Sequence, residues 1–190
     1  MGALWGYLYN LDLSFFYLIN HAGKNAPFDF IMPIITDISY FKVPIAVGFI
    51  ALIIWGGRKG RTVAILAIPL LILSEGSAQA IKAFIQRVRP CHVLEQVHLL
   101  VGCSGSYSFP SGHATNIFAA ALFLSRHYQN ITIPLYALAF LVGYSRVYVG
   151  VHYPLDVIAG TGLGIAWASV VLYLEKEAIP RIYPGFHCPY

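Results

Sequence analysis

The chain has 190 residues, of which 58% are hydrophobic and only 11% are charged, and its formal net charge is +4. Soluble domains carry about 25% charged residues, so this composition excludes a disordered chain, a nucleic-acid-binding arm and a charge-rich coiled coil. The mean hydropathy of +0.68 indicates a chain solvated largely by lipid. The length suits a single domain, residues 1–190, with about five or six membrane-crossing helices of about 20 residues each.

The first forty residues contain two apolar segments that polar residues interrupt. Leu4–Ile19 is rich in aromatic residues and leucine but contains Asn10 and Asp12, and Pro27–Tyr40 contains two aspartates and an internal proline. Both patterns are typical of amphipathic segments that lie at the membrane surface. We therefore expect residues 1–40 to form an N-terminal interfacial segment, with a sixth membrane crossing at Leu4–Ile19 as the alternative.

Five apolar stretches follow, and each predicts a membrane helix. They are Val43–Gly57, Thr62–Ser74 with a helical continuation to Phe84, Ala114–Ser125, Ile131–Tyr144 and Val157–Leu174. The last stretch contains Gly160 and Gly164 at the spacing that permits close packing of helices in lipid. The predicted fold class is all-α, a polytopic membrane bundle of five to six spans with its helical core over residues 41–175.

Loops rich in lysine and arginine predict the orientation of the bundle, because such loops remain in the cytoplasm. With five spans, six cations fall on one side: Arg58, Lys59, Arg61, Arg126, Lys176 and Arg181. The opposite side holds Arg87, Arg89 and Arg146, with Lys82 at its rim. Cations on the external side need a reason, and the simplest is an anion bound there.

The first cluster on the external side is Lys82-AFIQRV-Arg89-Pro90. Lys82 and Arg89 are seven residues apart, so a continuing helix would place both on one stripe, about 10 Å apart along its axis. Glu75 would join that stripe as a buried partner for a cation or as a polar contact between helices. The alternative is that both cations only extend to lipid headgroups.

The second cluster, residues 108–113, reads Ser-Phe-Pro-Ser-Gly-His and directly precedes a predicted span. Ser111 and Gly112 at the start of a helix would offer backbone N–H groups and the positive end of the helix dipole to a phosphate. His113 would lie in the first turn of that helix. Taken alone, Pro-Ser-Gly also fits an ordinary turn with a helix cap.

The third cluster begins at Ser145-Arg146 and continues to His152 and Asp156. The last two residues are four apart, so the carboxylate can accept a hydrogen bond from one ring nitrogen across a helical turn. That bond would fix the tautomer and leave the other nitrogen as an oriented base or nucleophile. A lone histidine near a helix cap is more often structural, but the neighbouring arginine favours a functional pair.

Phosphoryl transfer uses the parts that these three clusters supply together. Cations and N–H groups hold the equatorial oxygens, a nucleophile attacks in line, and an acid protonates the leaving oxygen. The patterns K-x6-RP, PSGH and SR-x5-H-x3-D resemble, in order and without departure, the motifs of the type 2 phosphatidic acid phosphatase superfamily. The resemblance covers roughly residues 40–175.

The resemblance implies an all-helical membrane enzyme that hydrolyses lipid phosphates or pyrophosphates without a metal or other cofactor. His152 would be the nucleophile that forms a phosphohistidine, Asp156 would orient it, and His113 would be the general acid. The residues that would bind the phosphoryl oxygens are Lys82, Arg89, Ser111, Gly112 and Arg146. Because His152 must be neutral and His113 protonated, we expect a bell-shaped pH–rate profile.

The expected substrate is an amphiphile whose phosphate enters a cationic pocket while its chains stay in the bilayer. Undecaprenyl pyrophosphate, phosphatidylglycerol phosphate, phosphatidic acid and the 1-phosphate of lipid A all fit, and the sequence does not choose among them. We expect a bacterial inner-membrane protein whose site faces the periplasm, with neither a nucleic acid nor an obligate protein partner. A lipid-to-lipid phosphotransferase and a non-catalytic binder or transporter of lipid phosphates are the alternatives.

Cys91 and Cys103 both lie in the loop of residues 85–112. The predicted topology places this loop outside the cytoplasm, where disulfides persist. We expect a disulfide that closes the loop over the pocket, with two unpaired thiols as the alternative.

Overall fold

The computed structural model describes the backbone of residues 2–182 and the side chains of residues 6–177. Every regular element in that part of the chain is helical, which confirms the all-α prediction. The α-helices are α1 (Gly2–Tyr17), α2 (Ala26–Thr36), α3 (Lys42–Trp55), α4 (Gly57–Ile85), α5 (Pro90–Val93), α6 (Gly112–His127), α7 (Thr132–Tyr148) and α8 (Pro154–Ile182). Short helical turns follow α1, α2 and α6, at Leu18–Ala22 (π), Ile38–Tyr40 (3-10) and Gln129–Ile131 (3-10).

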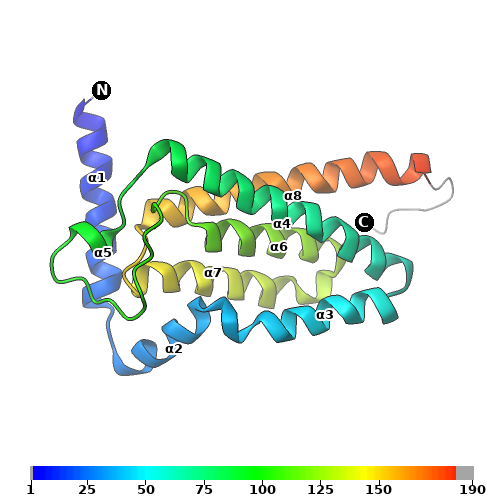
Figure 1. The fold of residues 1–190 in the computed structure, drawn as a ribbon, viewed down its shortest axis with the longest axis horizontal. Coiled ribbons are helices and arrows are strands. Elements are labelled where there is room, and N and C mark those ends of the chain that lie inside the picture. The colour runs from blue at the N-terminus through cyan, green and yellow to red at the C-terminus, as the bar shows by residue number, and fades with distance from the viewer. Residues whose placement is uncertain (1, 183–190) are drawn as a thin grey trace.

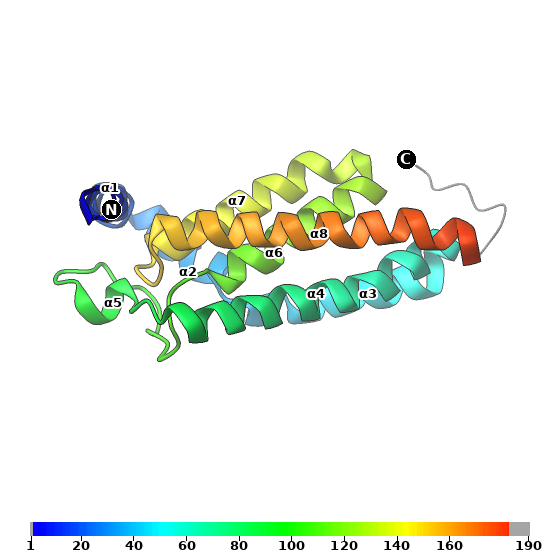
Figure 2. The ribbon, with the colours of Figure 1, turned by 90° about the horizontal axis from the view of Figure 1, so that it is seen from above.

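The helices of the bundle run along a common axis, with α6 packed against α4, α7 and α8, and with α3 packed against α4 (Figure 1). Helix α1 lies across one end of this bundle, and Figure 2 shows it end-on beside the long helices. The loops that carry the three sequence motifs gather at that same end. The turns between α3 and α4 and between α6 and α7 lie at the opposite end.

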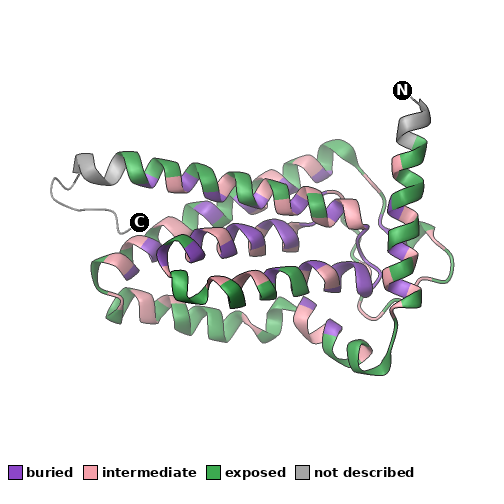
Figure 3. Cartoon of the chain, turned by 180° about the vertical axis from the view of Figure 1, so that it is seen from behind, coloured by how far each residue is buried: buried purple, intermediate pink, exposed green. Residues whose placement is uncertain are grey.

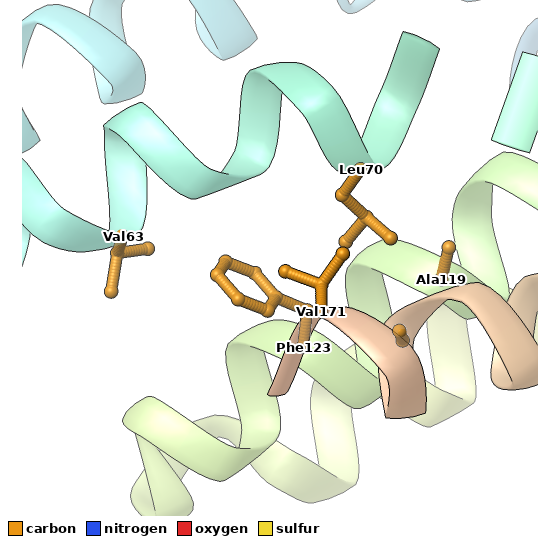
Figure 4. Close-up of a cluster of buried hydrophobic side chains, with 6 residues drawn as sticks. Val63, Leu70, Ala119, Phe123 and Val171 are labelled. Atoms are coloured by element: carbon orange, nitrogen blue, oxygen red, sulfur yellow. The ribbon is translucent and has the colours of Figure 1, made fainter. Parts of the chain in front are cut away.

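The core of the bundle is apolar and lies where α4, α6 and α8 meet. One cluster joins Val63 and Leu70 of α4 to Phe123 of α6 and Val171 of α8 (Figure 4). Figure 3 shows that buried positions gather on the inward faces, while the outward faces are exposed. Those outward faces carry large apolar side chains, including Phe84 at 90% exposure. A surface of this kind suits lipid as its solvent.

Three helical segments of the described chain are long and apolar enough to cross a membrane: Gly57–Val93, Gln129–Tyr148 and Pro154–Glu177. Helices α2 and α3 are apolar but shorter. Helix α6 has 16 residues and occupies the centre of the bundle. The protein is therefore an integral membrane helical bundle, and the predicted total of five to six spans stays a prediction.

The close packing expected of Gly160 and Gly164 occurs between α8 and α6. A Cβ atom at Gly164 would lie 2.2 Å from the carbonyl oxygen of Thr115, and one at Gly160 would lie 2.5 Å from that of Ser111. Only glycine permits the two backbones to approach this closely. The contact places the start of α8 against the start of α6, where two of the motifs end.

The predicted stripe from Lys82 to Arg89 on a continuous helix is wrong. Helix α4 ends at Ile85, because Gln86 adopts a left-handed conformation (φ 56°) and its N–H closes the helix on the carbonyl of Lys82. Arg89 lies in extended backbone directly before α5. The chain bends between the two cations, so they approach the site from different directions.

Candidate active site

His152 is held between an acceptor and a donor. Its Nδ1 lies 3.3 Å from Oδ2 of Asp156, and its Nε2 lies 3.0 Å from a terminal nitrogen of Arg89. A guanidinium only donates and a carboxylate only accepts. The contacts therefore place the proton on Nδ1 and leave a lone pair on Nε2. The ring is 1% exposed, so this tautomer is fixed in a dry environment.

The pKa of His152 reflects that environment. The pKa is lowered to about 3: burial is the largest cause, Asp156 opposes it, and the charges of Arg89 and Arg146 add to the lowering. Desolvation disfavours the charged form of a base. His152 is thus neutral at physiological pH, as a nucleophile must be.

Asp156 accepts hydrogen bonds on both oxygens. Besides His152, its Oδ2 accepts the hydroxyl of Ser108 and the N–H of Tyr153 (2.9 Å), and its Oδ1 accepts Arg87 at 2.7 Å. The carboxylate is fully buried. These partners fix the orientation of the carboxylate, so that its Oδ2 faces the imidazole of His152.

Lys82 and Arg89 hold the motif loops in place. The ammonium of Lys82 donates to the carbonyls of Tyr107 (2.9 Å), Ser108 (3.3 Å) and Pro110 (2.6 Å). Arg89 donates to the carbonyls of Ser106 (2.8 Å) and Val151 (3.0 Å) and to the hydroxyl of Ser106 (2.9 Å). Both cations are buried. They position the segments on either side of His152 in addition to supplying charge.

Arg146 and His113 line a cavity of about 410 Å³ that extends towards the end of α2. Its other walls are Pro33, Ile34, Thr36, Asp37, Ile38, Tyr40, Val101 and Gly102. Arg146 donates one hydrogen bond to the hydroxyl of Thr36, while its buried Nε has no hydrogen-bond partner. This guanidinium therefore retains donors for a ligand at the wall of the cavity.

Ser111 and Gly112 form the start of α6, as the cluster predicted. The hydroxyl of Ser111 accepts the N–H of Ala114 at 3.5 Å, and its own N–H donates to the carbonyl of Asp156 at 2.9 Å. The first N–H groups of a 16-residue helix lie beside the motif loops, where the helix dipole favours an anion.

Glu75 makes a polar contact between helices. Its two oxygens accept the amide groups of Gln79 at 2.6 Å and Asn116 at 2.7 Å. The sequence left two roles open for Glu75, a partner for a cation and a polar contact between helices. Its hydrogen bonds match the second role.

Cys91 and Cys103 are joined by a disulfide, with Cα atoms 6.3 Å apart. The bridge closes a loop whose residues Val101 and Gly102 line the cavity. The loop thereby forms one wall of the cavity beside Arg146.

Five residues of the site lie outside the predicted set: Asp12, Thr36, Asp37, Arg87 and Ser108. Ser108 and Arg87 stand inside or beside the motif segments, and Arg87 was noted only as a nearby cation. The other three belong to residues 1–40, where Asp12 and Asp37 served only as interruptions of an apolar pattern. For Asp12 and Asp37, a carboxylate within an apolar segment was the available signal, since such groups are usually paired.

The fold and the three motifs together define a class of helical membrane phosphatases. The profile of the PAP2 superfamily matches residues 62–180. The chain belongs to the PAP2 superfamily, which confirms the resemblance seen in the sequence.

Individual relatives support this assignment. The chain is 36% identical to an undecaprenyl-diphosphatase of Sulfolobus acidocaldarius, over 85% of this chain and 75% of that protein. It is 35% identical to a lipid A 4'-phosphatase of Porphyromonas gingivalis, over 64% of this chain and 54% of that protein. The crystal structure of Aquifex aeolicus LpxE has a TM-score of 0.75 at 32% identity, and the match covers 86% of this chain and 95% of that one.

Proposed function

We propose that the protein hydrolyses a phosphomonoester or pyrophosphate of a membrane lipid through a phosphohistidine at His152. The observation that carries this proposal is the environment of the His152 ring. Asp156 accepts a hydrogen bond from the Nδ1–H group, and the Nε2 lone pair lies next to Arg89. A neutral, oriented imidazole beside a buried cation is suited to attack a phosphorus atom whose oxygens that cation holds.

The reaction has two steps, and His113 acts in both. First, Nε2 of His152 forms a bond to phosphorus as the P–O bond to the lipid breaks, and His113 gives its proton to the leaving oxygen. Water then attacks phosphorus and His113 takes one of its protons. The N–P bond breaks, inorganic phosphate leaves, and His152 is neutral again.

The cavity beside His113 supports the assignment of the leaving group. The general acid must contact the leaving oxygen, so the lipid part of the substrate departs into the space that His113 lines. That space has apolar walls at Pro33, Ile34 and Val101 and reaches the first residues after α2. It suits the first part of a lipid next to its phosphate.

The site is proposed to face the periplasm of a bacterial inner membrane, within a single domain whose residues 1–40 lie at the membrane surface. Two observations support this orientation. The loop with the disulfide lies at the site end of the bundle, and disulfides persist outside the cytoplasm. The cationic turn Arg58–Arg61 lies at the other end, as cytoplasmic loops do.

The test is a phosphoenzyme assay with ³²P-labelled lipid in detergent. We expect an acid-labile phosphoenzyme in the wild type, a slower one in Asp156→Asn, and none in His152→Gln, with turnover of His152→Gln lower by about 10³-fold or more. His92→Gln, which changes an exposed histidine of the disulfide loop, is the matched control and should behave as wild type. Turnover of His152→Gln within a few-fold of wild type would overturn the proposal.

Phosphate release from the candidate lipids separates the remaining alternatives. The panel contains undecaprenyl pyrophosphate, phosphatidylglycerol phosphate, phosphatidic acid and lipid A 1-phosphate. Release from at least one of them is expected of a hydrolase. Release that requires a second acceptor lipid would indicate a phosphotransferase, and binding of the lipids without any turnover would indicate a binder or transporter.

A further inference from the structure

Arg87 is not a specified residue of any of the three motifs, yet it makes two ion pairs. One terminal nitrogen lies 2.7 Å from Oδ1 of Asp156, and the other lies 2.5 Å from Oδ2 of Asp12 in α1. Both carboxylate side chains are 0% exposed, whereas the Arg87 side chain is 21% exposed. One guanidinium is therefore shared by two buried carboxylates, one of them the partner of the proposed nucleophile.

Asp12 is also bound to the first turn of α8. Its Oδ1 accepts the N–H of Leu155 at 2.8 Å, the residue directly before Asp156. The first N–H groups of a helix have no partner within the helix, and the dipole there favours a negative charge. Asp12 thus stabilises the helix start that carries Asp156, although it lies 143 residues earlier in the chain.

The third contact of Arg87 is with Tyr153, in the turn between His152 and Asp156. Its guanidinium carbon lies 3.8 Å from the centre of the Tyr153 ring, and Tyr153 packs on Phe16 of α1 with ring centres 5.7 Å apart. Tyr153 directly follows His152. Two residues between His152 and Asp156 are therefore bound to α1 or to Arg87: Tyr153 and Leu155.

We propose that Arg87 and Asp12 are positioning residues for His152, and that through them the docking of α1 sets the geometry of the nucleophile. The inference rests on the proposed role of His152. Among the described residues, Oδ1 of Asp156 has Arg87 as its hydrogen-bond partner while Oδ2 faces the imidazole. Fixing one oxygen fixes the direction of the other, and the carboxylate in turn fixes the ring.

The two residues should affect the chemical step and leave phosphate binding unchanged. Neither belongs to the proposed phosphate ligands. Lysine at position 87 would keep the charge but lose the planar fork that spans two carboxylates. Asparagine at position 12 would keep an acceptor for Leu155 but lose the charge that pairs with Arg87.

The experiment compares Arg87→Lys, Asp12→Asn and their combination with wild type in detergent. We expect kcat and the rate of phosphoenzyme formation to fall about tenfold or more in Arg87→Lys and severalfold in Asp12→Asn. The inhibition constant of inorganic phosphate should stay within twofold. The double variant should be no slower than Arg87→Lys, because both changes act through one carboxylate.

Asp29→Asn is the matched control, since Asp29 is another carboxylate of the N-terminal segment that pairs with His98 (2.9 Å) away from Asp156. Its kcat should match the wild type. A kcat of folded Arg87→Lys and Asp12→Asn within twofold of wild type would overturn the inference, as would a loss confined to phosphate affinity. If the wild type forms no phosphohistidine, the proposed function fails instead, and the two failures are thereby distinguished.

Discussion

The cations that line the site are held by neutral partners, with one exception. Lys82 and Arg89 donate to carbonyls and a hydroxyl, and Arg146 donates to the hydroxyl of Thr36. Among the described residues, Arg87 is the site cation that forms ion pairs with carboxylates. Neutral acceptors orient a cation without cancelling its field, so the charges of Lys82, Arg89 and Arg146 still act on the site.

The low pKa of His152 predicts that its ring stays neutral far below the usual range. Burial lowers the pKa to about 3, so the imidazole should remain unprotonated from pH 8 down to pH 5, where an ordinary histidine with a pKa near 6.5 is charged. Nitrogen NMR of ¹⁵N-histidine-labelled protein, with His152→Gln for assignment, measures this directly. An imidazolium signal for His152 at pH 6 would contradict the prediction.

The same shift has a consequence for stability. A histidine whose pKa is lowered by folding takes up its proton more readily in the unfolded chain. The free energy of unfolding should therefore fall as the pH decreases below about 6.5. His152→Gln should lose part of this pH dependence in thermal unfolding.

Asp37 predicts a preference for monoesters over pyrophosphates. A hydrogen bond from the N–H of Ser39 lowers the pKa of Asp37, so an ionised carboxylate faces the cavity that His113 also lines. A pyrophosphate leaves as a charged lipid phosphate, which this carboxylate repels. Asp37→Asn should raise kcat/KM for a pyrophosphate relative to a monoester about threefold or more. An unchanged ratio, matching that of Asp29→Asn, would exclude this role.

The motif spacing predicted part of this site. His152 and Asp156 are four residues apart on a helix start, so their contact follows from local geometry, as does the capped start of α6 at Ser111. Asp12 and Thr36 could not be placed, because their partners are more than 100 residues away. Such contacts depend on how the N-terminal segment docks.

At the scale of the helices, the contact between α6 and α8 controls the site. Gly160 of α8 approaches the carbonyl of Ser111, and Ser111 in turn donates to the carbonyl of Asp156. The two motif segments are thereby joined by backbone contacts. A change of spacing between these helices would move Ser111 and Asp156 relative to each other.

Gly160→Ala should disrupt this contact, whereas Gly162→Ala should not. A Cβ atom at position 160 would lie 2.5 Å from a backbone oxygen, while one at position 162 meets nothing within 4 Å. Overpacking of this kind costs about 1–3 kcal/mol. We expect Gly160→Ala to lower the unfolding temperature by several degrees and kcat by about tenfold. Equal behaviour of the two variants in thermal unfolding and turnover would refute the expectation.

Most of the helices could be predicted, but the conformation of the turn that follows α4 could not. Uncharged stretches locate α4, α6, α7 and α8 because lipid demands apolar surfaces. The predicted end of α4 at Phe84 lies one residue from the observed end at Ile85, but the left-handed conformation of Gln86 could not be predicted, since this residue carries no glycine-like signal. The bend there is supported by the long-range contacts of Lys82 and Arg89 with the motif loops.

At the scale of the whole molecule, the two ends of the bundle differ in the use of their cations. At the end away from the site, Lys59 lies over the ring of Tyr128 at 4.9 Å and Arg61 donates to the carbonyl of Ile53. Arg181, which was predicted for the same side, lies outside the residues whose side chains are described. The net charge of +4 thus divides between an anchor at one end and an anion site at the other.

This asymmetry predicts the orientation of the protein in cells. In a Cys188→Ser background, Glu95→Cys in the disulfide loop should react with a membrane-impermeant maleimide added to spheroplasts. Asn130→Cys, at the turn between α6 and α7, should react only after the membrane is permeabilised. Both positions are exposed, so the reverse pattern of labelling would place the site in the cytoplasm.

The bridge through Arg87 has a consequence for biosynthesis. Asp12 is translated early, Arg87 in the middle of the chain, and Asp156 in the last of the described helices. The pair of His152 and Asp156 therefore forms only once α8 is present, and Asp12 of α1 can contact Leu155 only then. A partly synthesised chain would hold its cations without a nucleophile, so catalytic competence would arise in one late step of membrane insertion.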